Sequence, residues 1–447
     1  MPSTPRGWHS RVWNLTWPVI LANITVPMVG VVDVAVMGRL PEATYIAAVT
    51  MGAAMFSAVY WLFGFLRMGT TGLSAQAYGR GNSVDILGTL LRGLMIAATL
   101  GLLVISAQVP LQLLLFEMFG ASAEVSRLAG VYYQIRVWGA PGLLIQMVAL
   151  GLLFGLQRMR DTLWLSVSFN LMNLILDVVL VLGFDLGVAG VAIGTVVSEW
   201  TAAALGLFLV LRVFRQHGWP LRRPADLWTT AAWRGFFDVG GNLILRTFFV
   251  QLPFLAGSVL AARYGDVTLA VHGVLMQLFL VMTFSLDGFA HTAESLTGYC
   301  FGAGKPHALR LAGRYCGIWG IGTALMTGGV YVLFGDVFIG WLTTAPPVRE
   351  MAGEYLPWLG IAPLLCVGAF VYDGIFIGTT HIREMRNAML LSAAIWGGVL
   401  WLATPMAYHG VWLAMSVFMA VRTISLAAYH PRILRGAAAQ KAVVTGA

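Results

Sequence analysis

The sequence predicts an all-α integral membrane protein with twelve transmembrane helices, in two six-helix lobes related by a pseudo-two-fold axis along the membrane normal. Composition is the first observation behind this prediction: 59% of the 447 residues are hydrophobic and only 10% are charged, whereas soluble domains carry about 25% charged residues. The second is that apolar stretches of about 20 residues, long enough to cross a bilayer, recur along the whole chain, whose mean hydropathy is +0.81. The third is an internal repeat.

Breaks at glycine, proline and charged residues divide the chain into the expected helices. Several exceed the length needed to cross the bilayer, so they must tilt or extend beyond it. The first helix contains Asp33 and lacks a small-residue cleavage site, so we expect it to be retained rather than cleaved as a signal peptide. The expected helices are 12–38, 45–78, 86–116, 127–156, 162–183, 188–213, 231–262, 267–301, 308–335, 350–378, 387–407 and 410–430.

A constant offset of 223 residues relates the two halves of the chain. Because six helices is an even number, both halves enter the membrane from the same side, which makes the repeat parallel rather than inverted. We therefore expect two domains, residues 1–223 and 224–447, joined by the basic linker "RQHGWPLRRPADLW". The offset holds for Gly79 and Gly302, Gly155 and Gly378, Ala47 and Ala270, and Gly187 and Gly410.

The distribution of Lys and Arg predicts the orientation. Of 27 such residues, 19 lie at the N-terminus, in the even-numbered loops and in the C-terminal tail, and only four lie in the odd-numbered loops. Both termini are therefore expected in the cytoplasm. Topology and anionic lipid explain the net charge of +8, so we expect no nucleic-acid partner. The remaining four lie inside expected helices: Arg67, Arg136, Arg246 and Arg422.

Asp33 stands in the otherwise apolar run "VPMVGVVDVAVMG", residues 26–38. A charge at the centre of a transmembrane helix costs about 2.5 to 3.5 kcal/mol on insertion scales, and such residues usually face a cavity or a partner. Asp33 lies near the outer end of its helix, where it can exchange protons with water yet be shielded from it. We therefore expect Asp33 to have a function beyond packing.

The helix expected at 162–183 offers a second carboxylate. Asn170, Asn173 and Asp177 stand at i, i+3 and i+7, so they share one face of this helix. Asp177 lies near the outer end of its helix, as Asp33 does, so the two carboxylates are expected at one depth. Two carboxylates close together in a low dielectric do not easily both ionise, so one would hold a proton near neutral pH.

Two further features belong to this predicted proton site. Thr195 is eight residues into the next helix and is expected at a similar depth, where it could donate a hydrogen bond. Pro18 stands fifteen residues before Asp33 and removes a backbone donor, so the first helix could bend there and couple protonation to closure of a cavity. Candidate residues for an apolar substrate cavity are Met37, Tyr60 and Met172.

The second half is polar in a different way. Asp287, His291 and Glu294 fall at i, i+4 and i+7 on one expected helix, and Asp373 lies on another. His and Glu at such spacing can bind a metal. The interpretation we favour is that these side chains pair with intramembrane arginines and tie helices together. The role of Glu199, in the helix expected at 188–213, stays open. The arginines available for pairing are Arg67, Arg246 and Arg422.

Four strings together resemble the MATE family of multidrug and toxic-compound extrusion transporters, in its DinF branch: "VVDVAVMG", "FGFLRMGTTGLSAQAYGRGN", "LDGFAHTAES" and "DGIFIGTTHIREMRNAM". The resemblance extends over all twelve expected helices. It implies two six-helix lobes in alternating access and cation-coupled export of amphipathic, often cationic, compounds. It also implies that the first-helix carboxylate couples proton movement to export. By this resemblance the coupling residues are Asp33, Asn173, Asp177 and Thr195, and the bending proline is Pro18.

The resemblance has one departure. Sodium-coupled members place an acidic residue on the seventh helix, where this chain has Arg246 in "VGGNLILRTFFVQLPFLAGSVLAA" and no carboxylate. This favours proton over sodium coupling, although sodium at Asp33 and Asp177 stays possible. We expect no resident cofactor and no metal.

The function we predict is proton/drug antiport in the bacterial inner membrane, by a multi-pass protein that acts as a monomer. One alternative is a lipid-linked precursor flippase, which would need cations in its cavity for a pyrophosphate. The other is a membrane-embedded enzyme using His291 and Glu294, but the sequence lacks a nucleophile elbow, a paired-His motif and a cofactor loop. Three scattered cysteines indicate neither a disulfide framework nor a metal cluster.

Overall fold

The computed structural model describes residues 1–37, 43–119, 122–222 and 224–445; within these helices, the side chains of residues 26–37, 43, 58, 115, 118, 119 and 441–445 lie outside the description. The described residues form helices and their connections, without a β-strand. Eleven helical spans among them are long and apolar enough to cross a membrane. These spans and the absence of strands among the described residues confirm the predicted all-α membrane fold.

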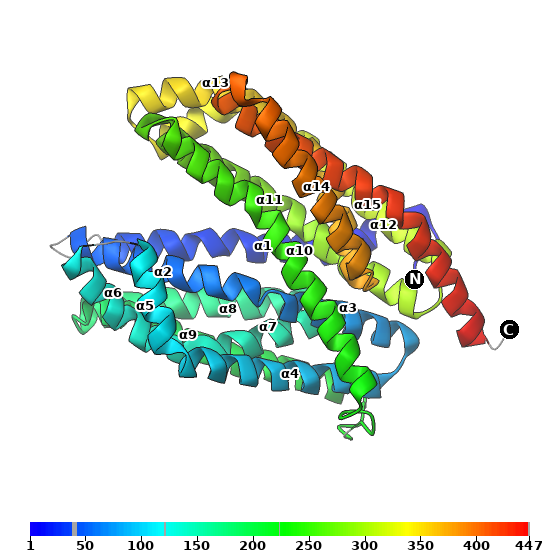
Figure 1. Cartoon of the computed structure of the whole chain (residues 1–447). Coiled ribbons are helices and arrows are strands. Elements are labelled where there is room, and N and C mark those ends of the chain that lie inside the picture. The colour runs from blue at the N-terminus through cyan, green and yellow to red at the C-terminus, as the bar shows by residue number, and fades with distance from the viewer. Residues whose placement is uncertain (38–42, 120–121, 223, 446–447) are drawn as a thin grey trace. The chain divides into compact units, whose positions relative to one another are not determined.

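The helices follow one another in the order shown in Figure 1. A short 3-10 turn, Val137–Gly139, connects α6 to α7, and a π-helical segment, Val178–Gly183, continues α8. The helices are α1 (Pro5–Met37), α2 (Ala43–Leu62), α3 (Phe65–Arg80), α4 (Ser83–Ser106), α5 (Gln108–Phe119), α6 (Ala123–Arg136), α7 (Ala140–Gly155), α8 (Met159–Asp177), α9 (Gly187–Gln216), α10 (Thr230–Arg263), α11 (Asp266–Gly302), α12 (Pro306–Leu342), α13 (Pro346–Gly378), α14 (Ile382–Leu402) and α15 (Tyr408–Thr445).

The chain divides into two compact units. The N-terminal unit contains Leu21–Tyr78 and Asn82–Phe236, and the C-terminal unit contains Met1–Ile20, Gly79–Gly81 and Phe237–Ala447. Helix α1 therefore passes from one unit to the other between Ile20 and Leu21. The boundary between residues 223 and 224 stays a prediction of the sequence repeat.

Helix α9 is the centre of the N-terminal unit. It packs against α6, α7 and α8, and α7 packs in turn against α4 (Figure 1). Small residues let these helices approach closely: a Cβ added at Gly206 of α9 would lie 2.8 Å from the Cβ of Ala149 in α7. In membranes, helix association depends on such close packing more than on hydrophobic burial.

Two glycines of α7 bring this helix against the backbone of α3. A Cβ at Gly151 would lie 2.5 Å from the carbonyl oxygen of Arg67, and a Cβ at Gly155 would lie 2.8 Å from the carbonyl oxygen of Thr71. Real Cβ atoms do not approach oxygen so closely, so α7 can lie here only with glycine at both positions.

The C-terminal unit repeats this arrangement. Helix α13 packs against α11 and α12, and an added Cβ at Gly374 or Gly378 of α13 would clash with the carbonyl oxygen of Ala290 or Glu294 in α11. All four residues are displaced by 223 from their counterparts in α7 and α3. The offset read from the sequence therefore recurs as a repeated helix-to-helix contact, with the same glycines in the same role.

Candidate functional site

The polar face predicted on α8 is present and buried. Asn170, Asn173 and Asp177 are 9%, 2% and 0% exposed. They lie at successive turns of one helix in the N-terminal unit. Since buried polar groups in an apolar surrounding cost free energy unless they are hydrogen-bonded, this face requires partners on the neighbouring helices.

Those partners are hydroxyl groups on α1 and α9. The side-chain amide of Asn170 donates a hydrogen bond to Oγ1 of Thr25 in α1 (2.5 Å), and that of Asn173 donates to Oγ1 of Thr195 in α9 (3.2 Å). Each hydroxyl donates in turn to a carbonyl of the preceding turn of its own helix, over 2.7 and 2.8 Å. The α8 network thus consists of two hydrogen-bonded pairs, Asn170 with Thr25 and Asn173 with Thr195, which join α8 to α1 and to α9.

Asp177 ends the regular part of α8, and the π-helical segment Val178–Gly183 follows it directly. Such segments are rare and often occur at functional sites. Its carboxyl lies against α9 because Gly194 has no side chain: a Cβ there would be 2.5 Å from Oδ1 of Asp177. A fully buried carboxyl is therefore seated on α9, one residue before Thr195.

Asp33 belongs to α1, but its side chain lies outside the described residues, as does that of Met37. The meeting of Asp33 with Asp177 therefore stays a prediction. Thr25, eight residues before Asp33 in the same helix, is the described link between α1 and α8. Pro18 is a buried residue within α1, which is helical throughout Pro5–Met37.

The two remaining candidates for the substrate cavity differ in their surroundings. Tyr60 is 6% exposed and belongs to a hydrophobic core together with Phe56, whose ring centroid is 5.3 Å away. Met172 is half-buried on α8. Both remain predictions as substrate contacts.

Sequence reasoning did not find a buried ion pair in the same unit. Nη1 of Arg136, at the end of α6, donates to Oε2 of Glu199 in α9 over 2.6 Å, and the guanidinium of Arg136 also lies over the rings of Phe56 and Tyr60. Glu199 is 0% exposed, and Gly139 makes room for its carboxylate. Removing either partner would leave an uncompensated charge in this buried position, so each side chain depends on the other.

The polar residues of the C-terminal unit form a separate cluster. Oδ2 of Asp373, on α13, accepts hydrogen bonds from Nη2 of Arg246 and Nη2 of Arg422, on α10 and α15. All three side chains are buried. The expected pairing of Asp373 with intramembrane arginines is confirmed, and it ties three helices together.

His291 and Glu294 contact each other, with Nδ1 of His291 3.3 Å from Oε2 of Glu294. Asp287 is half-buried on the same helix, α11. Within the part of the chain that the structure describes, no group of three or more His, Cys, Asp or Glu side chains is placed to hold a metal ion.

The polar side chains on this part of α8 and α9 are of the types that bind small cations or protons. Carboxylate, amide and hydroxyl oxygens from Asp177, Asn173 and Thr195 are hard donors, the type preferred by unpolarisable cations, and a carboxyl in a dry site also binds a proton readily. The second half of the chain does not repeat this polar group. At an offset of 223, Asn170, Asn173, Asp177 and Thr195 correspond to the apolar residues Ala393, Trp396, Leu400 and Phe418.

Comparison with known proteins agrees with this architecture. The MatE family model matches residues 18–179 and 243–400. DNA damage-inducible protein F of Escherichia coli K12 is 38% identical over 429 residues, which cover 94% of this chain and 92% of that protein. The probable multidrug resistance protein NorM of Rhizobium meliloti is 26% identical and is covered to 93%, against 95% of this chain.

Solved structures share the fold. A mutant of the Vibrio cholerae MATE transporter VcmN superposes with a TM-score of 0.85 at 17% identity, over 96% of this chain and 98% of that one. An outward-facing multidrug resistance MATE transporter superposes with a TM-score of 0.86 at 18% identity, over 96% of each chain. The family model, the E. coli relative and the shared fold lead to one conclusion: this chain belongs to the MATE family of membrane transporters, in its DinF branch.

Proposed function

We propose that the chain is a secondary active multidrug exporter that exchanges protons for amphipathic, often cationic, compounds. The observation that carries this proposal is the buried network in which α8 contacts α1 through Asn170 and Thr25, and α9 through Asn173 and Thr195. Asp177 lies fully buried on the same face. In this proposal the carboxyl binds and releases the coupled proton, and the hydrogen-bonded pairs on the same face pass the change to α1 and α9.

Proton coupling is favoured over sodium coupling by the C-terminal cluster. The carboxylate of Asp373 already accepts hydrogen bonds from Arg246 and Arg422. Two guanidinium groups repel a further cation, so this carboxylate is a poor sodium ligand. We therefore propose that the coupling ion binds in the N-terminal unit, where Asp33 and Asp177 are the proposed proton carriers.

Alternating access is the proposed mechanism, with α1 as the moving part. Helix α1 leaves the C-terminal unit after Ile20, two residues beyond Pro18, and enters the N-terminal unit at Leu21. In this proposal Pro18 allows bending where the helix changes units. Protonation then changes how α1 packs on α8, the cavity shrinks, and drug leaves outward.

Met37, Tyr60 and Met172 are the proposed cavity residues. The proposed topology has both termini in the cytoplasm, and the proposed active form is a monomer.

The flippase alternative needs unpaired cations in a cavity, and three of the four intramembrane arginines are committed elsewhere. Arg136 binds Glu199, and Arg246 and Arg422 bind Asp373. This pairing leaves little positive charge for a pyrophosphate and supports the exporter proposal.

The test uses inverted membrane vesicles, an imposed proton gradient and a fluorescent cationic dye. Wild-type protein should accumulate dye, whereas Asp33→Asn and Asp177→Asn should abolish accumulation, since neither amide can carry a proton. Asp185→Asn is the matched control, because Asp185 is exposed beyond the π-helical segment and has φ 55°, a conformation that asparagine also adopts. A sodium gradient at constant pH should not drive dye accumulation. Unchanged dye accumulation in both variants would refute proton coupling at these carboxylates.

A further inference from the structure

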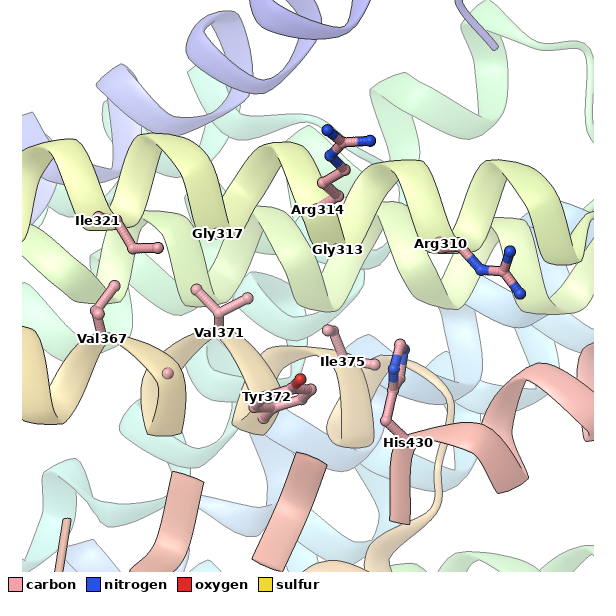
Figure 2. A pocket seen from close by; sticks show the side chains of 11 residues that line it. Arg310, Gly313, Arg314, Gly317, Ile321, Val367, Val371, Tyr372, Ile375 and His430 are labelled. Carbon is pink, nitrogen blue, oxygen red and sulfur yellow. The ribbon is translucent and has the colours of Figure 1, made fainter. Parts of the chain in front are cut away.

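A groove of about 360 Å³ lies within the C-terminal unit, between α12, α13 and α15. One stripe of α12 lines it at spacings of three and four residues, from Arg310 to Ile321, and opposite it lies a face of α13 from Val367 to Ile375. Figure 2 shows Val367, Val371 and Ile375 pointing from α13 toward α12. This groove is remote in sequence from the network on α8 and α9, and the proposed transport cycle does not use it.

The inner part of the groove is apolar and open. Gly317 lies in the middle of the α12 stripe, and a Cβ there would meet no atom within 4 Å. Val371 is buried opposite, and Ile321, at the far end, is 48% exposed. An elongated apolar trough that opens onto the outer surface of a membrane helix suits an acyl chain.

The other end of the groove is basic. Arg310 and Arg314 are exposed on α12, and His430 of α15 lies with its ring 5.7 Å from that of Tyr372. Figure 2 shows the Arg310 guanidinium at the same end of the groove as His430, and the Arg314 guanidinium pointing away from α13. Among the described residues, no carboxylate lies within 4.0 Å of either guanidinium.

The depth of these arginines fits a lipid headgroup. Helix α12 has 37 residues, about 55 Å at 1.5 Å per residue, against a hydrocarbon core of about 30 Å. A centred helix extends roughly 12 Å beyond the core at each end. Arg310 and Arg314 stand four and eight residues after its start at Pro306, about 6 and 12 Å along it. Both therefore lie at headgroup depth, on the side where the sequence predicts cytoplasm.

We propose that this groove binds one anionic phospholipid. An acyl chain lies in the trough along Gly317 and Val371, and the phosphate lies at the basic end, against Arg310, with the charge of Arg314 one turn further along α12. Cationic drugs are the substrates proposed for the transport cavity. The guanidinium groups at the basic end of this groove would repel them. Basic residues beside a membrane helix attract anionic lipid by about 1 kcal/mol each, so charge selects the occupant.

The experiment titrates purified full-length protein in detergent with dioleoyl phosphatidylglycerol and reads the Kd by native mass spectrometry. Dioleoyl phosphatidylcholine has the same chains with a zwitterionic headgroup, and inorganic phosphate has the charge without chains. Three variants are compared: Arg310→Gln with Arg314→Gln, Gly317→Leu, which fills the trough, and Gly322→Leu. The last is the matched control, because Gly322 is on the same helix, also faces open space, and does not line the groove.

We expect one saturable phosphatidylglycerol site whose Kd rises about thirtyfold when both arginines are neutralised. Gly317→Leu should also weaken binding, at least tenfold, while Gly322→Leu leaves the Kd within twofold. Arg310→Lys with Arg314→Lys should restore binding, which separates loss of charge from misfolding. Equal affinity for phosphatidylcholine, equal Kd values for Gly317→Leu and Gly322→Leu, or displacement of the lipid by inorganic phosphate would each overturn the proposal.

Discussion

The side-chain amide of Asn173 donates a hydrogen bond to the hydroxyl of Thr195 over 3.2 Å, and this contact joins α8 to α9 next to the buried carboxyl of Asp177. The same face of α8 reaches α1 through Asn170 and Thr25. The repeat gives the two units similar helix packing, but its equivalents of this network are apolar. This polar network is therefore confined to one of the two units, although the helix packing around it is repeated in the other.

The first prediction concerns this hydrogen bond. Thr195→Val removes the acceptor of the Asn173 amide while keeping the shape of the side chain, so a buried donor loses its partner, at a cost of about 1 to 3 kcal/mol in the free energy of unfolding. Dye transport should fall as well. Thr201→Val is the control, since its hydroxyl is exposed and bonds only to its own helix. Equal losses in both variants would show that the contact has no special role.

The second prediction concerns the packing of the Asp177 carboxyl against Gly194 of α9. Gly194→Ala places a Cβ 2.5 Å from Oδ1 of Asp177, closer than such atoms approach, so the carboxyl must move, and transport driven by a proton gradient should fall at least tenfold. Gly183→Ala adds the same methyl group in open space nearby, and transport by this variant should stay near the wild-type rate. A wild-type rate in Gly194→Ala would mean that the position of this carboxyl does not matter.

The third prediction concerns the Arg136 and Glu199 pair. Arg136→Met leaves Glu199 buried without its cation, which should lower the free energy of unfolding by about 3 to 5 kcal/mol. Combining Arg136→Met with Glu199→Met removes both charges and should recover most of that loss. Thermal unfolding in detergent, followed with a thiol-reactive dye, measures this, because all three cysteines are buried in the folded protein. A double variant as unstable as the single one would contradict the pairing argument.

The fourth prediction tests the repeat. Gly155→Ala and Gly378→Ala each force a methyl group against the backbone of a neighbouring helix, and overpacking of this kind costs about 1 to 3 kcal/mol. The two variants should lose similar stability in the same assay. Gly397→Ala, where the added atom meets nothing within 4 Å, should be neutral or slightly stabilising. A neutral effect at only one of the two repeat positions would argue against equivalent packing.

Local spacing predicted much of the site. Three polar residues at i, i+3 and i+7 must share a helix face, so the sequence alone predicts that Asn170, Asn173 and Asp177 lie together. The offset of 223 predicted which glycines recur, because both copies need the same close approach. Pairs between different helices could not be predicted in this way. Arg136 and Glu199 are 63 residues apart, and no periodicity relates them.

The sequence also could not predict which residues of neighbouring helices contact the site. Gly194 resembles any other membrane-helix glycine until the Asp177 carboxyl is seen against it. Thr25 stands in the same helix as Asp33, eight residues earlier, and that spacing was the one signal that could have suggested it. Asp373 was expected to pair with an arginine, but only the folded chain shows that it contacts two.

Proton release on drug binding tests the central claim most directly. Purified protein in weakly buffered detergent is mixed with a fluorescent cationic dye, and the pH of the solution is followed. We predict release of about one proton per bound dye in the wild type, and none in Asp33→Asn or Asp177→Asn. Dye binding without proton release in the wild type, or unchanged release in both variants, would contradict the account.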